Sequence, residues 1–370
     1  MTASATITRV SVRTASFSTA TWLGEQRVSS PMSWFTAYAD RRSSWRGPGA
    51  DLVWIWIETD EPDVFGIGQS RGGAVTVALI EQHLSHLLIG SDALEVARRT
   101  EEIRRATSPY AAGGIAAMGA SACELALWDL SARFAGVPLV TLLGGSGDPL
   151  PFYLTVADVA ALDGIEEPAI RDAELVKRPA RFGPADGRDG FRANLNDLVV
   201  LRERLPDSVG VAVDCFMSWD VAYAAEFARA AAELGLVWIE EPLPPDDLKG
   251  YAELRGRVSP VRIAGGEHLF SLRDGLRFIE GRCADVLQVD VTWCGGLRLA
   301  ATLGAVAQDN GIRFAPHAAA TQPWALHMLG AAGPGALAEI MVGLGSEGVL
   351  RPAPGTTPGV GIAPASVGFA

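Results

Sequence analysis

Three carboxylates stand at even spacing in the sequence, each at the end of an apolar stretch. Asp214 follows Val-Gly-Val-Ala-Val, Glu240 follows Leu-Val-Trp-Ile, and Glu267 follows Val-Arg-Ile-Ala-Gly-Gly, with helical patterns between them. The carboxyl ends of buried parallel strands meet at one rim, where three acids repel one another unless a hard divalent cation lies among them. The spacing therefore predicts a Mg²⁺ site formed by these three acids. The alternative is that each acid caps a helix or pairs with an arginine.

Asp290 and His317 end the next two predicted strands. Neighbouring strands lie about 4.8 Å apart, so the two side chains are expected to be close. An aspartate that accepts the Nδ1–H of a histidine fixes its tautomer and leaves Nε2 to take or give a proton. This pair predicts a general base; the alternative is a histidine satisfied within the core.

Two further ionisable residues end predicted strands of the same set. Lys177, one of only two lysines in the chain, can hold a substrate carboxylate or, if desolvated, act as a base. Glu339 ends the last predicted strand, where a protonated carboxyl could donate a hydrogen bond to a substrate oxygen. A metal, an ammonium and a histidine base around one anion indicate abstraction of a proton next to a carboxylate. The resulting enediolate carries two negative oxygens that such cations stabilise.

The elements that position these residues alternate between strand and helix along residues 139–345. This alternation predicts a modified TIM barrel, (β/α)7β, whose strands have the following bounds: Phe152–Val156, Glu174–Arg178, Val209–Asp214, Val237–Glu240, Val261–Ala264, Val286–Asp290, Arg313–Pro316 and Ala338–Val342. Residues 1–138, with strands at Ile7–Ser16 and Leu52–Thr59 and three helical patterns, predict an α+β capping domain. Residues 346–370 are expected to pack back on that domain.

A long segment at about residues 20–49 has little periodicity and is rich in tryptophan and arginine, including Trp22 and Arg42. Segments of this length without regular structure are usually either functional or disordered. The composition favours a lid that folds over an anionic ligand and helps to select it.

The composition limits the classes of function. The chain has 370 residues, 48% of them apolar, and a net charge of −12, which is typical of a soluble globular protein and argues against nucleic acid or an anionic membrane as partner. The amino terminus shows no signal peptide, so we expect a cytoplasmic protein. The four cysteines have no paired metal spacing, and a reducing compartment suits them.

Several motifs carry a resemblance to a known family. They are Val213-Asp-Cys-Phe-Met-Ser-Trp-Asp220, Trp238-Ile-Glu-Glu-Pro-Leu-Pro-Pro-Asp246, Gly266-Glu-His268, Gln288-Val-Asp-Val-Thr-Trp-Cys-Gly-Gly-Leu297, Pro316-His317 and Leu127-Trp-Asp-Leu130. With them the chain resembles the mandelate racemase subgroup of the enolase superfamily, and within it most closely the L-rhamnonate dehydratase subfamily. The match runs nearly from end to end of the chain.

The resemblance implies a Mg²⁺-dependent acid-sugar (aldonate) dehydratase that forms a 2-keto-3-deoxy sugar acid. It implies Mg²⁺ on Asp214, Glu240 and Glu267, with His317 and Asp290 as the base dyad and Glu339 as the electrophile near the carboxylate. It also implies that Lys177 helps to position the substrate and that Arg42 contacts it from the lid; Trp22 is a further candidate for substrate binding. His268 is either a support for the metal site or a substrate contact. We also expect a homo-oligomer.

Two departures from the subfamily leave the sugar open. The subfamily carries a histidine in its amino-terminal loop, whereas this chain has none before His83, and Ala318-Ala319-Ala320 replaces a Gly-Ser after the base histidine. Racemisation needs a second base, and Pro179 stands where a racemase of this subgroup keeps a lysine, which favours dehydration over racemisation or cycloisomerisation. A non-catalytic metal-binding homologue is the remaining alternative.

Overall fold

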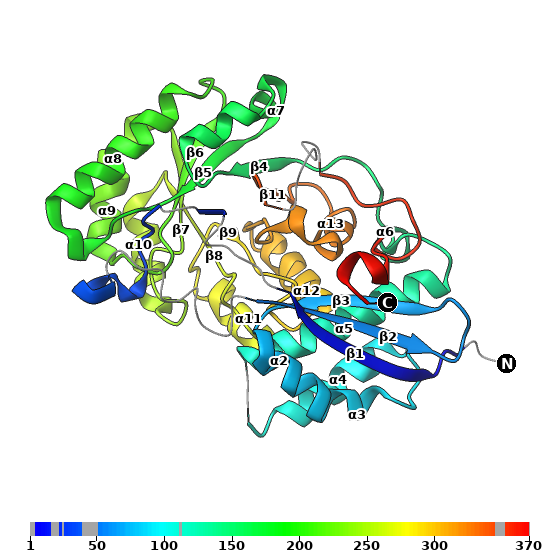
Figure 1. The fold of residues 1–370 in the computed structure, drawn as a ribbon. Helices are drawn as coiled ribbons and strands as arrows, with labels where there is room; N and C mark the ends of the chain where they lie inside the picture. The colour runs from blue at the N-terminus through cyan, green and yellow to red at the C-terminus, as the bar shows by residue number, and fades with distance from the viewer. Residues whose placement is uncertain are drawn as a thin grey trace.

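The computed structural model describes residues 4–15, 22–23, 26–38, 51–110, 113–344 and 352–369. Figure 1 shows a three-stranded sheet backed by helices beside a larger curled sheet that is surrounded by helices. Both ends of the chain lie by the three-stranded sheet. Among the described residues, no helix is long and apolar enough to cross a membrane.

The three-stranded sheet is antiparallel and contains β1 (Ile7–Ala15), β2 (Leu52–Thr59) and β3 (Phe65–Ser70) in that order. Alternate residues of β2, namely Val53, Ile55 and Ile57, are fully buried against the helices, as the two-residue period of a strand requires. The first two strands follow the predicted ones closely. The third was not predicted.

The unpredicted strand β3 carries two glycines that allow helix α5 (Ile115–Phe134) to lie against its backbone. A Cβ atom at Gly66 would lie 2.0 Å from the carbonyl oxygen of Ala126, and one at Gly68 would lie 2.0 Å from that of Ala122. Glycine is a poor strand former, so a sequence pattern that contains these two residues does not predict a strand, although the packing requires them.

The remaining helices of the capping domain precede and follow α5. They are α2 (Gly73–Leu79), the π-helical turn η4 (Ile80–Leu84), α3 (Ser85–Leu88) and α4 (Val96–Thr107), and α6 (Leu139–Leu142) follows directly after the predicted boundary. The carboxylate of Asp129, on α5, is fully buried and accepts hydrogen bonds from Ile67 N (2.8 Å), Val360 N (2.7 Å) and Arg133 Nε (2.9 Å). One side chain thus joins α5, β3 and the carboxy-terminal segment.

The larger sheet is parallel and has eight strands in the order β10-β9-β8-β7-β6-β5-β4-β11. Their bounds are β4 (Phe152–Thr155), β5 (Leu175–Pro179), β6 (Gly210–Asp214), β7 (Leu236–Glu240), β8 (Arg262–Gly265), β9 (Val286–Leu287), β10 (Arg313–Phe314) and β11 (Ala338–Met341). A backbone hydrogen bond of 3.0 Å from Leu337 N to Phe314 O links the two ends of this order. The predicted (β/α)7β class of fold is therefore confirmed, with β9 and β10 shorter than predicted.

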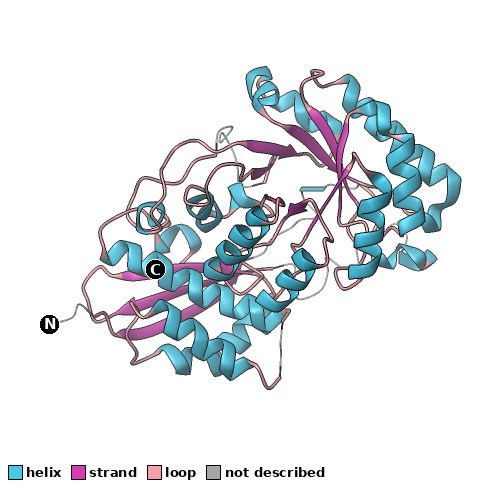
Figure 2. Ribbon diagram, turned by 180° about the vertical axis from the view of Figure 1, so that it is seen from behind, coloured by secondary structure: helices cyan, strands magenta, loops and turns pink. Residues whose placement is uncertain are grey.

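Helices cover the outside of the curled sheet, as Figure 2 shows from behind. They are α7 (Glu167–Asp172), α8 (Gly187–Glu203), α9 (Val221–Ala230), α10 (Leu248–Val258), α11 (Leu272–Glu280), α12 (Leu297–Asp309) and α13 (Pro323–Leu329). One buried cluster draws its side chains from each strand or its immediate flank: Tyr153, Leu175, Ala212, Trp238, Ala264, Val286, Ala315 and Leu337. This filled layer leaves the carboxyl ends of the strands as the place for a site.

Two described residues of the predicted lid lie on the rim of the curled sheet. Trp22 Nε1 donates to the carbonyl oxygen of Val342 (2.6 Å), just beyond β11, and Ser29 N donates to that of Ala180 (2.9 Å), just beyond β5. Arg42 lies outside the described residues. The lid therefore stays a prediction, with Trp22 and Ser29 bound at the carboxyl ends of β11 and β5.

The carboxy-terminal residues 352–369 run along the capping domain. Leu139 N donates to Gly359 O (2.9 Å), Arg133 Nη2 donates to Ile362 O (2.6 Å), and the ring of Phe369 lies 5.7 Å from that of Trp56 on β2. The domain boundaries at residues 138 and 345 stay a prediction.

Candidate active site

Asp214 and Glu240 are paired in register at the carboxyl ends of β6 and β7. Glu240 is fully buried; its Oε1 accepts from Lys177 Nζ and its Oε2 accepts from Gln288 Nε2 at 2.6 Å. Asp214 Oδ1 accepts from Phe216 N at 3.0 Å. The two predicted acids therefore stand side by side on neighbouring strands.

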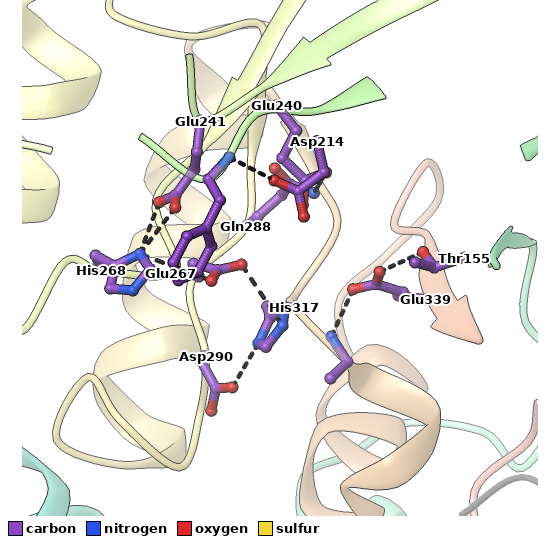
Figure 3. A network of polar contacts seen from close by, with 12 residues as sticks. Thr155, Asp214, Glu240, Glu241, Glu267, His268, Gln288, Asp290, His317 and Glu339 are labelled. Atoms are coloured by element: carbon purple, nitrogen blue, oxygen red, sulfur yellow. Dashed lines mark hydrogen bonds and ion pairs between the residues drawn. The ribbon is translucent and has the colours of Figure 1, made fainter. Parts of the chain in front are cut away.

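Glu267 lies in the turn after β8 and faces the two histidines of the site (Figure 3). Its Oε2 is 3.5 Å from His317 Nε2, and its Oε1 is 3.6 Å from His268 Nδ1. The pKa of Glu267 is raised to about 7 and that of Glu240 to about 8; burial is the main cause, repulsion from Asp214 adds to it in both, and the nearby His317 and Lys177 oppose it. The pKa of Asp214 is also raised, chiefly by burial. The three acids thus share one electrostatic environment.

Within the described residues, the tightest group of possible metal ligands is not the predicted trio but Glu241, Glu267 and His268, whose ligand atoms lie within 4.8 Å of one another. Glu240 is held instead by Lys177 and Gln288. Strand alternation would turn Glu241 away from Glu240 and His268 away from Glu267. Both residues lie beyond their strands, and Glu241 has a left-handed φ of 38°, so the alternation does not apply to them.

His268 forms a second histidine-carboxylate pair. Its Nδ1 is 2.8 Å from Glu241 Oε2, and although burial lowers the pKa of the imidazole, Glu241 raises it overall to about 9. Sequence reasoning did not single out Glu241. Glu241 is the second glutamate of the Glu-Glu-Pro sequence in the motif that begins at Trp238, and the sequence analysis gave a role only to the first.

The candidate dyad of Asp290 and His317 is in direct contact. His317 Nδ1 lies 2.8 Å from Asp290 Oδ2, which also accepts from Gln322 Nε2 at 2.8 Å, while Asp290 Oδ1 accepts from Thr292 N (2.7 Å) and Oγ1 (2.6 Å). Burial alone would raise the pKa of Asp290, but these hydrogen bonds lower it below its ordinary value. The carboxylate stays ionised and orients the imidazole with Nε2 towards Glu267.

Lys177 and Glu339 form a buried ion pair at 2.9 Å, and the ammonium also contacts Glu240. Burial would lower the pKa of Lys177, but the two carboxylates raise it well above its ordinary value. Glu339 additionally accepts from Thr155 Oγ1 and from Ala318 N (2.7 Å), and although burial opposes it, Lys177 contributes most to lowering the pKa of Glu339 to about 2. The expectation of a protonated Glu339 is therefore wrong, because every group that it contacts favours the anion, and a desolvated neutral Lys177 is equally disfavoured.

Two further residues of the site were missed by sequence reasoning. Arg71 follows β3; burial lowers its pKa to about 10, while the nearby charges of Asp290 and Glu267 oppose that change. Trp293 lies with its ring centroid 5.2 Å from that of His317 and 5.4 Å from that of His268. The unpredicted β3 hid the position of Arg71.

The chain was compared with known families and structures. Residues 48–144 match the mandelate racemase / muconate lactonizing enzyme N-terminal domain, and residues 181–363 match the enolase C-terminal domain-like family. A protein of Caldivirga maquilingensis, provisionally named an L-rhamnonate dehydratase, is 33% identical over 293 residues, which cover 78% of this chain and 71% of the relative. The chain belongs to the enolase superfamily.

Solved structures agree with the placement of this enolase-superfamily protein. The crystal structure of L-rhamnonate dehydratase from Gibberella zeae superposes with a TM-score of 0.86 at 28% identity, covering 99% of this chain and 96% of that one. The crystal structure of rhamnonate dehydratase from Gibberella zeae complexed with Mg gives a TM-score of 0.87 at 26% identity, covering 99% of this chain and 96% of that one. A racemase from Streptomyces coelicolor A3(2) with bound magnesium gives 0.75 at 26% identity, over 96% of this chain and 97% of that one. The architecture is thus shared by relatives whose names describe different reactions.

Proposed function

We propose that this enolase-superfamily protein is a Mg²⁺-dependent acid-sugar dehydratase. The observation that carries the proposal is the Asp290–His317 dyad, at 2.8 Å, with His317 Nε2 directed towards Glu267 on the rim where Asp214 and Glu240 also stand. The names of the relatives from Caldivirga and Gibberella support the same reaction class. An L-rhamnonate-like aldonate is the substrate that these names favour.

The donor set fits a hard divalent cation, because carboxylate oxygens are the ligands that Mg²⁺ prefers and burial has left these carboxylates with raised pKa values. Asp214, Glu240 and Glu267 would hold the ion. When bound, Mg²⁺ supplies positive charge that stabilises the negative oxygens of an enediolate and offsets the carboxylates that hold His317 protonated. The crowding of Glu241 and His268 beside Glu267 supplies a support for this third ligand.

His317 carries the proton transfers. In its neutral form, Nε2 takes the proton from the carbon next to the substrate carboxylate, and the electron pair of that C–H bond forms the enediolate. The enediolate then expels the hydroxyl group of the next carbon, to which the same Nε2 returns the proton, so that water leaves. The enol that remains tautomerises to a 2-keto-3-deoxy acid. Asp290 keeps Nδ1 protonated throughout and so keeps Nε2 available.

The strand-end position opposite Asp214 argues against a racemase. Pro179 is paired in register with Asp214, so this part of the rim offers no ionisable side chain that could serve as a second base. Lys177, two residues earlier, is 1% exposed and held as a cation by Glu240 and Glu339. Its proposed role is to place a fixed positive charge beneath the substrate.

The proposed function is tested by turnover. Purified protein with Mg²⁺ should convert at least one member of a panel of aldonates, including L-rhamnonate, into a 2-keto acid, detected as the semicarbazone. Chelation of the metal should stop the reaction and added Mg²⁺ should restore it. Inversion at the α-carbon without loss of water would show a racemase instead, and binding of aldonates without turnover would show a non-catalytic homologue.

We expect Asp290→Asn to lower kcat by roughly 10²–10⁴-fold. The amide can donate to Nδ1 and hold the imidazole in the wrong tautomer, although the packing around the site is kept. The measurement is steady-state turnover of the best aldonate. Asp309→Asn, at the end of α12, is the matched control and should be without effect. An Asp290 variant that keeps its kcat would remove the dyad from the mechanism.

Mg²⁺ binding should become tighter as the pH rises from about 6 to 8. Because the pKa values of Glu240 and Glu267 are raised to about 8 and about 7, part of the population must lose protons before these carboxylates can bind the ion. Below these values protons compete with the metal, and above them they do not. Isothermal titration calorimetry in buffers of different ionisation enthalpy should show protons released on binding, and an affinity independent of pH would contradict the assignment.

A further inference from the structure

The indole ring of Trp293 lies close to both histidines of the site. Its ring centroid lies 5.2 Å from His317 at an interplanar angle of 48°, and 5.4 Å from His268 at 53°. On its other side, the ring of His268 contacts Phe216 at 6.0 Å and Phe270 at 6.4 Å. The indole therefore belongs to a group of aromatic rings packed around the two imidazoles.

The loop that carries Trp293 is fixed in place. Trp293 N and Cys294 N both donate to the carbonyl oxygen of Asp290, at 3.1 and 2.9 Å. From the capping domain, Ser70 Oγ donates to Thr292 O (2.7 Å), and Ser121 Oγ accepts from Gly295 N (2.8 Å). The indole is thus held on both sides of its position in the chain, which suits a group that must meet a ligand with defined geometry.

The indole nitrogen of Trp293 is buried and has no hydrogen-bond partner within the described part of the chain, while the residue as a whole is 7% exposed. An unpaired buried N–H is unfavourable, so a ligand atom that accepts its hydrogen bond is bound more tightly. A polyol chain carries hydroxyl oxygens that accept such a bond. The neighbouring imidazoles already direct Nδ1 to a carboxylate, that of His268 to Glu241 and that of His317 to Asp290, each at 2.8 Å.

We propose that the indole N–H of Trp293 donates a hydrogen bond to a hydroxyl group of the acid-sugar substrate and makes Trp293 a specificity-determining residue. The proposal rests on the proposed function in that the ligand is an aldonate. It assigns to Trp293 the recognition of one hydroxyl group of the chain, whereas His317 recognises the reacting carbon.

The test is the variant Trp293→Phe, which removes the N–H and keeps an aromatic ring. Binding is measured by isothermal titration calorimetry with 3-deoxyaldonates, which lack the leaving hydroxyl and cannot be dehydrated. We expect the variant to bind the 3-deoxyaldonate that keeps all its other hydroxyl groups roughly 10- to 100-fold more weakly than the wild type binds it. For one analogue that lacks a single further hydroxyl, at C4, C5 or C6, the two proteins should bind with equal affinity.

A matched control is Trp56→Phe, since the indole nitrogen of Trp56 also lacks a partner among the described residues but its ring lies against Phe369 on the capping domain. This variant should bind every analogue as the wild type does. A comparison within the wild type does not depend on the folding of a variant. The wild type should bind the one analogue that lacks the recognised hydroxyl the same 10- to 100-fold more weakly than it binds the parent 3-deoxyaldonate.

The outcomes separate the two proposals. Suppose that the wild type binds and dehydrates aldonates. If Trp293→Phe then binds every analogue with unchanged affinity, or if its affinity falls by the same factor for every analogue, the role of the indole N–H is overturned. If the wild type neither binds nor dehydrates any aldonate, the proposed function fails. A selective loss for one hydroxyl supports the inference and identifies the carbon that Trp293 reads.

Discussion

His317→Asn is expected to abolish dehydration, with kcat lower by at least about 10⁴-fold, because one imidazole performs both proton transfers. The structure supports this concentration of roles: His317 Nε2 faces Glu267, Asp290 holds Nδ1 at 2.8 Å, and Pro179 provides no base at the carboxyl end of β5. The variant should also lose exchange of the substrate α-proton with deuterated solvent. Both losses are measured in one experiment, by NMR of the aldonate in D₂O with Mg²⁺.

The matched control for this experiment is His86→Asn, a histidine on α3 of the capping domain, which should dehydrate at the wild-type rate. Retained α-proton exchange in His317→Asn would show that another group removes the proton. His268, paired with Glu241 at 2.8 Å, is then the base to examine, and His317 keeps only the role of acid.

Lys177→Met should lower the free energy of unfolding by about 3–5 kcal/mol, the cost of leaving buried carboxylates without their cation. Lys177 is 1% exposed, and its ammonium contacts Glu240 and Glu339, neither of which is accessible to water. The loss is measured by urea unfolding of the metal-free protein at pH 7.5. Turnover should be lost as well, because the fixed charge in the site is gone.

The pH dependence of this variant follows from the same carboxylates. Without the ammonium, Glu240 and Glu339 lose the contact that most opposes the effect of burial, so both pKa values rise and the two acids take up protons more readily as the pH falls. The deficit in stability relative to the wild type should therefore shrink at lower pH. Lys249→Met, which changes the only other lysine, an exposed residue, is the control and should alter stability by less than about 0.5 kcal/mol. An equal loss in both variants would contradict a special role for Lys177.

The parallel strands were predictable because they are continuous apolar runs that are buried on both faces, and the acids that end them were found with them. The strand β3 was not predictable. Gly66 and Gly68 are required because the backbone of α5 packs directly against them, and this requirement comes from tertiary packing. The predicted strand Val286–Asp290 also ends early, at Leu287. The carboxylate of Asp290 binds Thr292 N and its carbonyl accepts from Trp293 N, and these local hydrogen bonds replace the sheet.

The candidate site was predictable to the extent that a residue's position on a strand decides where its side chain points. This holds for Asp214, Glu240 and Lys177. It fails for Glu241, where the chain turns with a φ of 38°, and for the ionisation of Glu339, which depends on Lys177 two strands away in the sheet order. Charge balance among buried groups is a property of the assembled rim and leaves no pattern in the sequence.

The loop that carries Asp290 and Trp293 is held by hydrogen bonds from Ser70 and Ser121, which belong to the capping domain. The loop that follows Asp290 of the proposed dyad is therefore joined directly to the capping domain, although the residues in contact are more than a hundred positions apart in the sequence. Capping domains exchanged between relatives would be expected to alter the rate of the chemical step and not only the choice of substrate. New substrate specificities among relatives would then arise through coordinated substitutions on both sides of this contact, and seldom through the exchange of a whole capping domain.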